Sequence, residues 1–593
     1  MVEFVFVSLG RIPLGQKILL DKLEEKGITT KLISMQTLFS NVFDELGEDS
    51  FRSKRKREEF HEGVKAYLRA VKSNIEGSQF FGMTFFDTIG EKETSFVVAK
   101  EIKKAFPNSI LIAGGPAFNS DPKAFLKESG ADYALRGEAE NTLPKLIEII
   151  SKRKEGKIQD IPGIMFRKEG RIYSHPLNAK LTAEEIQNSK FAYLKQGNVA
   201  FTYSERGCKN ACIFCTIPRK GNPIMINTKT IIDGIEQLAQ NKDIKQISFL
   251  DDQFFSDTKR ANEILNEIIK RKLNKRFIFD CAATIESLLK NGKPNLALLR
   301  KIKQAGIFGM ELGLEALNDN MLRELKGNRY TKVQAIEVLK ALKKTGISTN
   351  NYLLAGGINT RARDFIESYY SALRLEMKGI ANFFSNAIIG ATKKTPIHAQ
   401  AEKENSLFTM RGRKVGPLKE GRTGFRLAIP KDEELRRMFL EKLRKKEGRQ
   451  FNSNDLPRVI KMGQESKDKV AQKYAKKLQK IQGENTAHTT TLRQIANNIK
   501  LRIASREMQK QKIKFNLNNL KLFLSNPVIN EAINKEAIMR YHQYLPQLNK
   551  AKTLTGIKRL KAIQKMRKQT GIGMTYQFDI VKEKRNSLRR QIG

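Results

Sequence analysis

Three of the four cysteines in the chain lie close together, as Cys208, Cys212 and Cys215 in the stretch ERGCKNACIFCTIPRK. The fourth, Cys281, lies in the apolar run FIFDCAA and is typical of a small core residue. A secreted disulfide framework spreads paired cysteines along a short chain, and this distribution does not match one. We therefore expect free thiols in a reducing cytoplasm, and a cluster of three that could bind metal.

The number of ligands limits which metal this cluster could hold. A structural zinc site needs four ligands around one ion, and no histidine or second cysteine pair lies near the three cysteines. An iron–sulfur cluster that only transfers electrons also uses four thiolates. Three thiolates leave one iron open to a small molecule. The spacing therefore favours a reactive cluster, with structural zinc as the alternative.

The elements before the cysteines alternate between strands and amphipathic helices, from residue 1 to about 150. The strand-like segments are VEFVFVS, TTKLIS, QFFGMTF, SILIAGG and ADYALRG. This alternation predicts a doubly wound parallel sheet with helices on both faces. Ligands of such sheets bind beyond the carboxyl ends of the strands. A hairpin within IPGIMFRKEGRIYSHP belongs to a predicted linker, residues 151–195.

A second alternating series runs from residue 196 to 400. Its strand-like segments are NVAFTYS, QISFLDD, FIFDCAA, FGMELGLE, STNNYLLAGG and NFFSNAIIG. Six strands with crossover helices predict a partial or full α/β barrel, whose active site lies at the carboxyl ends of the strands. The three cysteines come directly after the first of these strands, which places them at that end.

The remaining residues, 401–593, are predicted to form a mainly helical and strongly basic extension. From residue 393 onward there are 48 basic and 17 acidic residues, so this part carries +31 of the net charge of +46. Such a field attracts polyanions, with nucleic acid, anionic lipid or an acidic protein as candidates. A solvated, lysine-rich surface is the alternative. No apolar run approaches the ~18 residues of a membrane span, so none is expected.

The motif Cys-x3-Cys-x2-Cys, with Phe214 before the last cysteine, resembles the signature of radical S-adenosylmethionine (SAM) enzymes. The resemblance implies a [4Fe-4S] cluster on the three cysteines and SAM bound to the open iron. It also implies reductive cleavage of SAM to a 5′-deoxyadenosyl radical, fed by a flavodoxin- or ferredoxin-like donor. By the same resemblance, the candidates for SAM binding are Phe214, Asp251, Asp252 and Glu311. Solvated turn carboxylates are the alternative for the two aspartates.

The stretch ILIAGGPAFNSDPKAFLKESGADYALRGEAENTLPKLIEI is similar to the cobalamin-binding domain of one branch of that family. The resemblance implies a cobalamin site formed by Gly15, Thr84, Gly114, Gly115, Gly137 and Glu138. The branch's histidine motif, Asp-x-His-x-x-Gly, is not present. Its place reads GRIPLG, so cobalamin would have no protein imidazole as a lower ligand.

These features together predict a cobalamin-dependent radical SAM enzyme that methylates an unactivated carbon. Within enzymes, the alternative is a radical cyclisation, a rearrangement or a nucleic-acid modification without methylcobalamin. From another class, the alternative is a nucleic-acid-binding protein with a structural metal cluster. The sequence does not indicate the substrate.

Overall fold

The computed structural model describes residues 2–9, 14–35, 54–85, 91–120, 122–217, 219–411, 414–417, 425–445, 451 and 455–482. The chain divides into a compact unit of residues 1–476 and a second unit of residues 477–593. Most of the second unit, and with it the helices expected after residue 482, lies outside the described residues.

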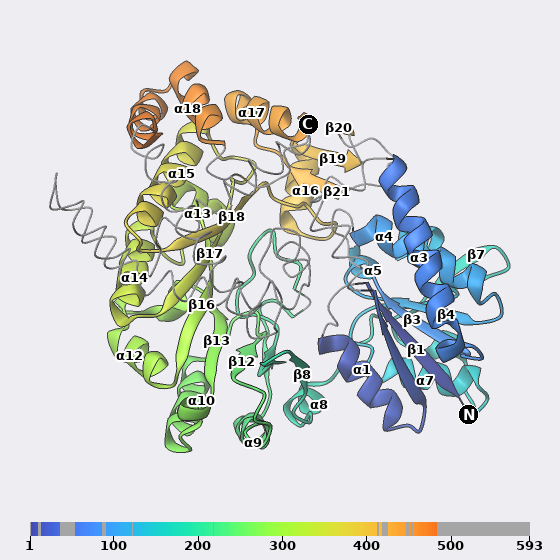
Figure 1. Ribbon diagram of the computed structural model, residues 1–593. Helices are drawn as coiled ribbons and strands as arrows, with labels where there is room; N and C mark the ends of the chain where they lie inside the picture. Colours follow the sequence, from blue (N-terminus) through green and yellow to red (C-terminus); the bar gives the residue numbers. More distant parts are fainter. Residues whose placement is uncertain are drawn as a thin grey trace, which may run out of the picture. The chain divides into compact units, whose positions relative to one another are not determined.

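The amino-terminal sheet contains five parallel strands, in the order β2-β1-β3-β4-β5 (Figure 1). The strands are β1 (Glu3–Ser8), β2 (Thr29–Ser34), β3 (Phe80–Thr84), β4 (Ile110–Gly114) and β5 (Tyr133–Leu135). The strand order reverses between β1 and β3, and ligands of doubly wound sheets bind at such a switch point. This confirms the predicted doubly wound parallel sheet.

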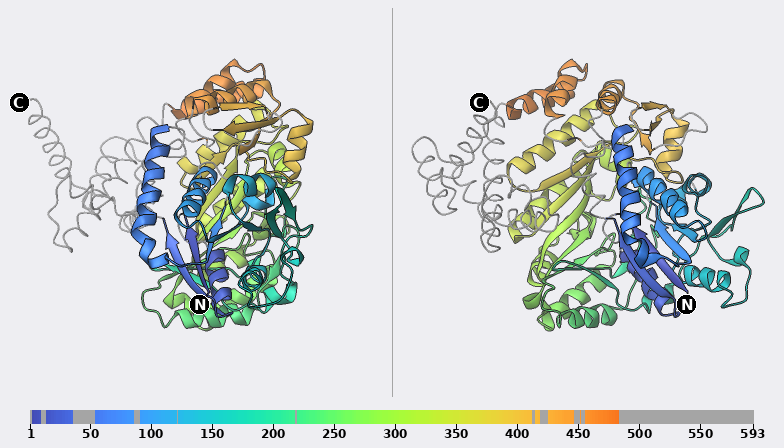
Figure 2. Two further views of the ribbon diagram at one scale, coloured as in Figure 1. Left: turned by 90° about the vertical axis from the view of Figure 1, so that its right-hand side faces the viewer. Right: turned by 45° about the vertical axis from the view of Figure 1, so that its right-hand side comes forward.

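Helices cover both faces of this sheet because apolar side chains alternate along β1. Phe4 and Phe6 pack with α1 (Leu14–Glu24) and α7 (Thr142–Ile150) on one face. Val5 and Val7 pack on the other face, where the helices are α3 (Lys54–Ile75), α4 (Glu91–Ala105) and α6 (Pro122–Ser129). Figure 2 shows the long helix α3 beside the strands.

The hairpin expected in the linker is present as β6 (Ile164–Lys168) and β7 (Arg171–Ser174). Its turn contains Glu169 and Gly170, both with positive φ. The hairpin pairs antiparallel with β5 and extends the first sheet to seven strands. The hairpin therefore belongs to the amino-terminal sheet, and the domain boundary at residue 150 stays a prediction.

The second sheet contains all six strands expected between residues 196 and 400. They are β9 (Val199–Thr202), β12 (Gln246–Phe249), β13 (Ile278–Ala283), β16 (Ile307–Glu315), β17 (Ser348–Leu354) and β18 (Asn382–Ala387). The strands are parallel and lie in the order β18-β17-β16-β13-β12-β9, with β8 (Tyr193–Gln196) antiparallel at the edge beyond β9. Since β9 and β18 do not pair with each other, the barrel is partial.

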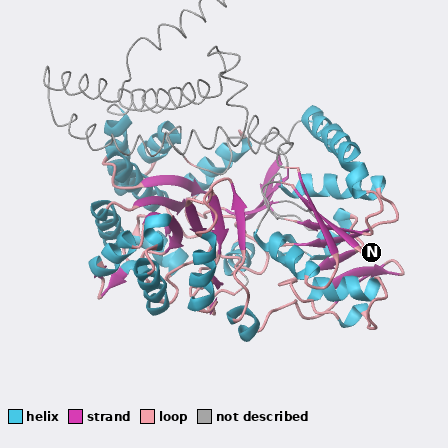
Figure 3. Cartoon of the chain, turned by 60° about the horizontal axis from the view of Figure 1, so that its bottom comes forward, coloured by secondary structure: helices cyan, strands magenta, loops and turns pink. Residues whose placement is uncertain are grey.

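Crossover helices pack on the outer side of this partial barrel (Figures 1 and 3). They include α9 (Thr228–Leu238), α10 (Thr258–Lys270), α12 (Leu296–Gln304), α14 (Lys332–Thr345) and α15 (Ala362–Met377). Alternate strand residues point toward these helices; Phe279, Cys281 and Ala283 of β13 lie in the helix-side core. Cys281 is therefore a core residue, as its apolar surroundings in the sequence indicated.

The extension begins differently from the expectation. After α16 (Pro396–Lys403) the chain forms an antiparallel sheet of β19 (Leu407–Arg411), β20 (Lys414–Pro417) and β21 (Phe425–Ala428). Only from α17 (Glu433–Arg444) and α18 (Leu456–Glu465) onward is the described part helical. We did not predict this small sheet because its strands are short and interrupted by arginine and glycine.

Several cations of the extension are engaged by the fold itself. Arg436 donates a hydrogen bond to the carbonyl of Asn405 and stacks on Phe408. Lys442 is buried and lies 2.8 Å from a carboxylate oxygen of Asp455. The charge count therefore overstates the cations that α17 can offer a polyanion. Among the described residues, no helix has the length and apolar character that crossing a membrane requires.

Candidate active site

The three cysteines lie in the loop that follows β9, at the carboxyl end of the partial barrel. Cys208 and Cys212 are buried, Cys215 is half-buried, and all three are free thiols. Burial, together with the charges of Cys212 and Cys215, raises the pKa of Cys208 to about 11. Burial also raises the pKa of Cys215. Three thiolates so placed need a positive partner such as a metal centre.

Each sulfur accepts a hydrogen bond from the chain. The backbone N–H of Asn210 lies 3.4 Å from Sγ of Cys208, and that of Ile217 lies 3.4 Å from Sγ of Cys215. The guanidinium of Arg329 lies 3.2 Å from Sγ of Cys212. Donors around cysteine sulfurs are typical of iron–sulfur sites, where they stabilise the anionic cluster.

The arrangement of the sulfurs suits a cluster better than a single ion. Among the described residues, no three Cys, His, Asp or Glu side chains are placed to bind one common metal ion. Zinc needs its ligands at ~2.0–2.3 Å from one point. In a [4Fe-4S] cluster each thiolate binds a different iron, so the sulfurs need not converge. The three cysteines therefore fit the cluster, and Cys208, Cys212 and Cys215 would hold it.

A polar network surrounds two of these cysteines. The side-chain oxygen of Gln253 lies 3.3 Å from Sγ of Cys208 and 3.2 Å from Nδ2 of Asn210. The same amide of Asn210 donates to Oε1 of Glu286 at 2.7 Å. Glu286 lies 3.9 Å from Nη1 of Arg329, the group that contacts Cys212. The network thus links the surroundings of Cys208 and Cys212 on opposite sides of the loop.

The residues expected to bind SAM have different surroundings. Phe214 packs on an apolar cluster that includes Ile389, Ile397 and Leu407. Asp252 is exposed and accepts a backbone hydrogen bond from Gly207; crowding by protein atoms raises the pKa of its carboxyl. Glu311 is exposed on β16 and bonds the hydroxyl of Tyr352 on β17. Their roles in SAM binding stay predictions.

Asp251 is engaged by the end of β9. Its Oδ1 accepts hydrogen bonds from the backbone N–H of Ser204 (2.6 Å) and Glu205 (2.7 Å), and its Oδ2 accepts one from the Ser204 hydroxyl (2.9 Å). Burial raises the pKa of Asp251 to about 6. These hydrogen bonds hold the chain that follows β9 in place. They give no support to the predicted contact of Asp251 with SAM.

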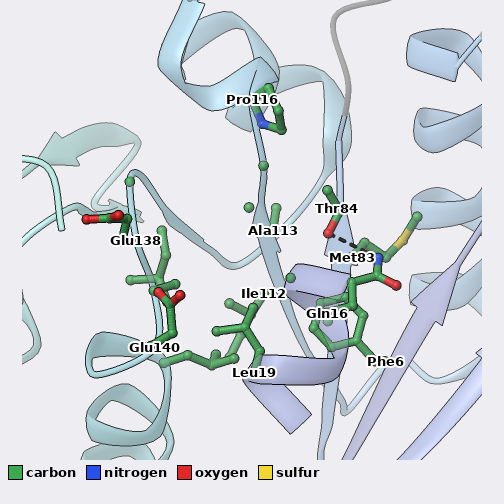
Figure 4. A pocket seen from close by; sticks show the side chains of 18 of the residues that line it. Phe6, Gln16, Leu19, Met83, Thr84, Ile112, Ala113, Pro116, Glu138 and Glu140 are labelled. Carbon is green, nitrogen blue, oxygen red and sulfur yellow. Dashed lines mark hydrogen bonds between the residues drawn. The ribbon is translucent and has the colours of Figure 1, made fainter. Parts of the chain in front are cut away.

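A cavity of about 330 Å³ is lined by Phe4 and Phe6 of β1, by the carboxyl-terminal parts of β3 and β4, and by residues at and after the end of β5 (Figure 4). All six residues expected to bind cobalamin line it: Gly15, Thr84, Gly114, Gly115, Gly137 and Glu138. Gln16 also lines the cavity and donates a hydrogen bond of 3.1 Å to the hydroxyl of Thr84. The other amide atom of Gln16, Oε1, is buried and has no hydrogen-bond partner among the described residues. A ligand with hydrogen-bond donors, such as the amide-bearing corrin of cobalamin, fits this lining.

At two of the six candidate positions, the backbone conformation and its close neighbours already require glycine. Gly137 has φ +95°, and a Cβ there would lie 2.0 Å from the carbonyl oxygen of Ala179. Gly115 has φ +100°, and a Cβ there would lie 2.7 Å from the carbonyl oxygen of Phe85. Close backbone approach therefore explains both glycines whether or not a ligand binds. Cobalamin contact by the six residues stays a prediction.

Comparison with known proteins agrees with this architecture. Residues 203–368, which include the cysteines and most of the partial barrel, match the family model of the radical SAM superfamily. The chain contains a radical SAM domain. The predicted family is thereby confirmed, together with the [4Fe-4S] cluster and SAM that define its chemistry.

Relatives extend the likeness beyond that domain. An uncharacterized methyltransferase of Pyrococcus horikoshii is 25% identical over 335 residues, which cover 54% of this enzyme and 69% of the relative. The radical SAM methyltransferase TsrM of Kitasatospora setae, solved with cobalamin and a [4Fe-4S] cluster, has a TM-score of 0.55 at 15% identity and covers 70% and 78% of the two chains. The cobalamin-dependent radical enzyme OxsB, solved with aqua-cobalamin and SAM, has a TM-score of 0.56 at 15% identity and covers 96% and 84%. The radical SAM enzyme therefore has the fold of cobalamin-dependent members of its family.

We did not single out several residues of the site from the sequence. The sequence gives no signal for Gln16, because glutamine is common in amphipathic helices such as the one that contains it. Arg329, which contacts Cys212, and Glu286, which contacts Asn210, lie more than seventy positions along the chain from these partners. Arg206 and Arg219, which flank the cysteines, bind carboxylates of the first sheet. Only the position of these two arginines beside the motif could have indicated a role.

Proposed function

We propose that this radical SAM enzyme binds cobalamin in the cavity of the first sheet and methylates an unactivated carbon. The observation that carries the proposal is the cavity itself, which lies at the switch point of a doubly wound sheet and contains the unpartnered amide oxygen of Gln16. The methyltransferase names of two relatives support the same reaction class.

When bound, the reduced cluster supplies the electron that cleaves SAM, and methylcobalamin supplies the methyl group. The chain contributes the positions of these groups. Cys208, Cys212 and Cys215 hold the irons, while Glu311 and Asp252 offer carboxylates at the open end of the barrel, where SAM hydroxyl and amino groups would bind. Gln16 and Thr84 offer polar atoms to the corrin.

Cobalamin in this site would have no protein imidazole below the cobalt. No histidine lines the described cavity, and the segment GRIPLG before α1 contains none. A ¹⁵N label in the protein should therefore leave the electron paramagnetic resonance spectrum of the bound Co(II) form unchanged, because any nitrogen splitting would come from the benzimidazole of cobalamin. A spectrum that this label changes would contradict this part of the proposal.

The test of the whole proposal is anaerobic reconstitution with iron, sulfide and hydroxocobalamin, followed by product analysis with methyl-labelled SAM. Gly15 lines the cavity, and a Cβ there would have no atom of the described residues within 4 Å. Gly15→Phe should block cobalamin binding without distorting the chain, and Gly15→Ala should retain it. Cys212→Ala should lose the cluster absorbance near ~400 nm and SAM cleavage. Equal cobalamin retention by Gly15→Phe and wild type would place the corrin elsewhere.

The products decide between methyl transfer and the other radical reactions. Label transferred to a product carbon supports the proposal, whereas 5′-deoxyadenosine formed without any methylated product supports cyclisation or rearrangement. A flavodoxin- or ferredoxin-like protein is the proposed electron donor, since SAM cleavage consumes an electron. The comparisons do not point to a nucleic-acid substrate.

A further inference from the structure

Two arginines of the cysteine loop bind two carboxylates that line the cavity of the first sheet. Arg206 precedes Cys208 by two residues, and Arg219 follows Cys215 by four. Their partners, Glu138 and Glu140, follow β5 and line the cavity (Figure 4). We propose that these four residues, here called the Glu–Arg joint, position the cysteine loop against the cavity and thereby couple cobalamin binding to cluster binding.

The contact between Arg219 and Glu138 is bidentate. Nε of Arg219 lies 2.9 Å from Oε1 of Glu138, and Nη2 of Arg219 donates to Oε2 of the same carboxylate. Nη2 also donates to the carbonyl of Leu181 at 2.5 Å, and the N–H of Leu181 donates to Oε2 of Glu138 at 2.9 Å. Arg219 is only 9% exposed. A buried fork of this kind fixes orientation as well as distance.

The contact between Arg206 and Glu140 is the second half of the joint. Nη1 of Arg206 lies 2.6 Å from Oε1 of Glu140 and 3.6 Å from Oε1 of Glu138. Nη2 donates to the hydroxyl of Tyr203 at 2.8 Å, and the guanidinium lies over the Tyr203 ring. Arg206 therefore lies close to both carboxylates, and its contacts with Tyr203 fix the orientation of its guanidinium.

Electrostatics agree with two ionised partners. Burial raises the pKa of Glu138, but the hydrogen bonds and charge of Arg219 outweigh burial, and the net pKa lies below the usual value. The four side chains are largely shielded from water and paired with each other.

The joint holds both ends of the cysteine loop at once. Those ends are bonded to each other, because the N–H of Cys208 donates to the carbonyl of Arg219 (3.3 Å) and the N–H of Gly221 donates to the carbonyl of Cys208 (2.7 Å). A shift of Glu138 and Glu140 would therefore move the whole loop that carries the cluster ligands. An occupant of the cavity restrains these two carboxylates, since they are part of its lining.

Coupling of this kind is reciprocal, so the cluster should tighten cobalamin binding by the same factor as cobalamin tightens cluster binding. The inference rests on the proposed cobalamin site, and its test has an arm that does not need cobalamin. Both arms use the full chain, kept anaerobic.

The first arm measures hydrogen–deuterium exchange without any cofactor. Glu138→Gln weakens the fork without changing its size, and should speed exchange in peptides covering residues 203–222. The matched control is Arg276→Met, which removes an arginine that donates to the carbonyls of Ile244 and Asn241 and lies over the Phe277 ring. The control should leave exchange in residues 203–222 unchanged. Unchanged exchange in Glu138→Gln would overturn the joint.

The second arm measures the dissociation constant of hydroxocobalamin with and without the cluster. In wild type we expect the cluster to tighten binding about five-fold or more, the lower end of typical coupling. In Arg206→Lys and Arg219→Met this factor should fall toward one, while Arg276→Met keeps it. Equal affinity with and without the cluster in wild type would overturn the coupling and needs no variant. If cobalamin does not bind at all, the proposed function fails, and the exchange arm alone decides the joint.

Discussion

Glu205 offers a sharp test of the electrostatics beside the cysteine loop. Its side chain is 3% exposed, and Oε1 accepts a hydrogen bond from the Ser256 hydroxyl (2.7 Å). Within the part of the chain that the structure describes, the buried Oε2 has no partner. Burial and the nearby charge of Asp251 raise its pKa from 4.5 to about 8. The folded protein should therefore hold a proton on Glu205 at neutral pH.

This raised pKa makes stability depend on pH in a defined direction. Because the folded pKa exceeds the unfolded one, the contribution of Glu205 is fully present below pH ~4.5 and is lost as pH rises toward ~8. pH 7 lies about 2.5 pH units above the unfolded pKa of Glu205. Ionisation of Glu205 therefore stabilises the unfolded state by ~3 kcal/mol at this pH. Glu205→Gln is neutral in both states and avoids this loss. It should be more stable than wild type by up to ~3 kcal/mol at pH 7 and similar near pH 4.5.

The assay is urea unfolding of the cluster-free full chain, followed by circular dichroism at several pH values between ~5 and ~8. The midpoint for Glu205→Gln should change less over this range than the midpoint for wild type. Glu155→Gln, on an exposed loop, is the control and should follow wild type. Parallel pH profiles for wild type and Glu205→Gln would show that Glu205 is ionised in the folded protein, and the reasoning would be refuted.

Three further predictions concern the site. Arg329→Met should lower the reduction potential of the cluster by ~60 mV, because a charge-assisted bond of ~1.5 kcal/mol to sulfur favours the reduced, more negative state; a redox titration followed by electron paramagnetic resonance measures this. Gly115→Ala should lower stability by ~1–3 kcal/mol or more, from positive φ and backbone contact, whereas Gly15→Ala should not, as thermal unfolding would show. Lys326→Met should cost ~3–5 kcal/mol, because it leaves the buried Glu315 carboxylate, 3.3 Å away, without its cation. In that case adding Glu315→Leu should restore much of the stability, and a double variant as unstable as the single one would contradict a charge effect.

The sequence predicted what depends on local periodicity. Alternation in VEFVFVS places Val5 and Val7 on one face and Phe4 and Phe6 on the other, which is enough to require helices on both sides of the sheet. The cysteine spacing and its position after a strand were sufficient to identify the cluster loop. The six cavity residues came from the resemblance to a cobalamin-binding domain, and all six line one cavity of the structure.

Contacts between segments far apart in the chain could not be predicted in this way. Arg206 and Glu140 are 66 positions apart, and Arg219 and Glu138 are 81 apart, so no helical or strand period relates them. The hydrogen bonds between Asp251 and the chain after β9 depend on the register of β9 with β12, which only the folded sheet shows. Burial also decides between roles for carboxylates that look alike in the sequence, as the buried Asp251 and the exposed Asp252 show.

The small sheet after residue 400 has a consequence for how the enzyme can be divided. Leu407 of β19 and Ala428 of β21 share one apolar core with Ile389 and Ile397, and the cysteine-loop residues Ile213 and Phe214 pack on that core. A chain that ends at residue 400 would lose part of the apolar core on which the cysteine loop packs. Exchange of carboxyl-terminal regions between related enzymes should therefore join sequences beyond β21, so that the loop keeps the apolar support with which it folds.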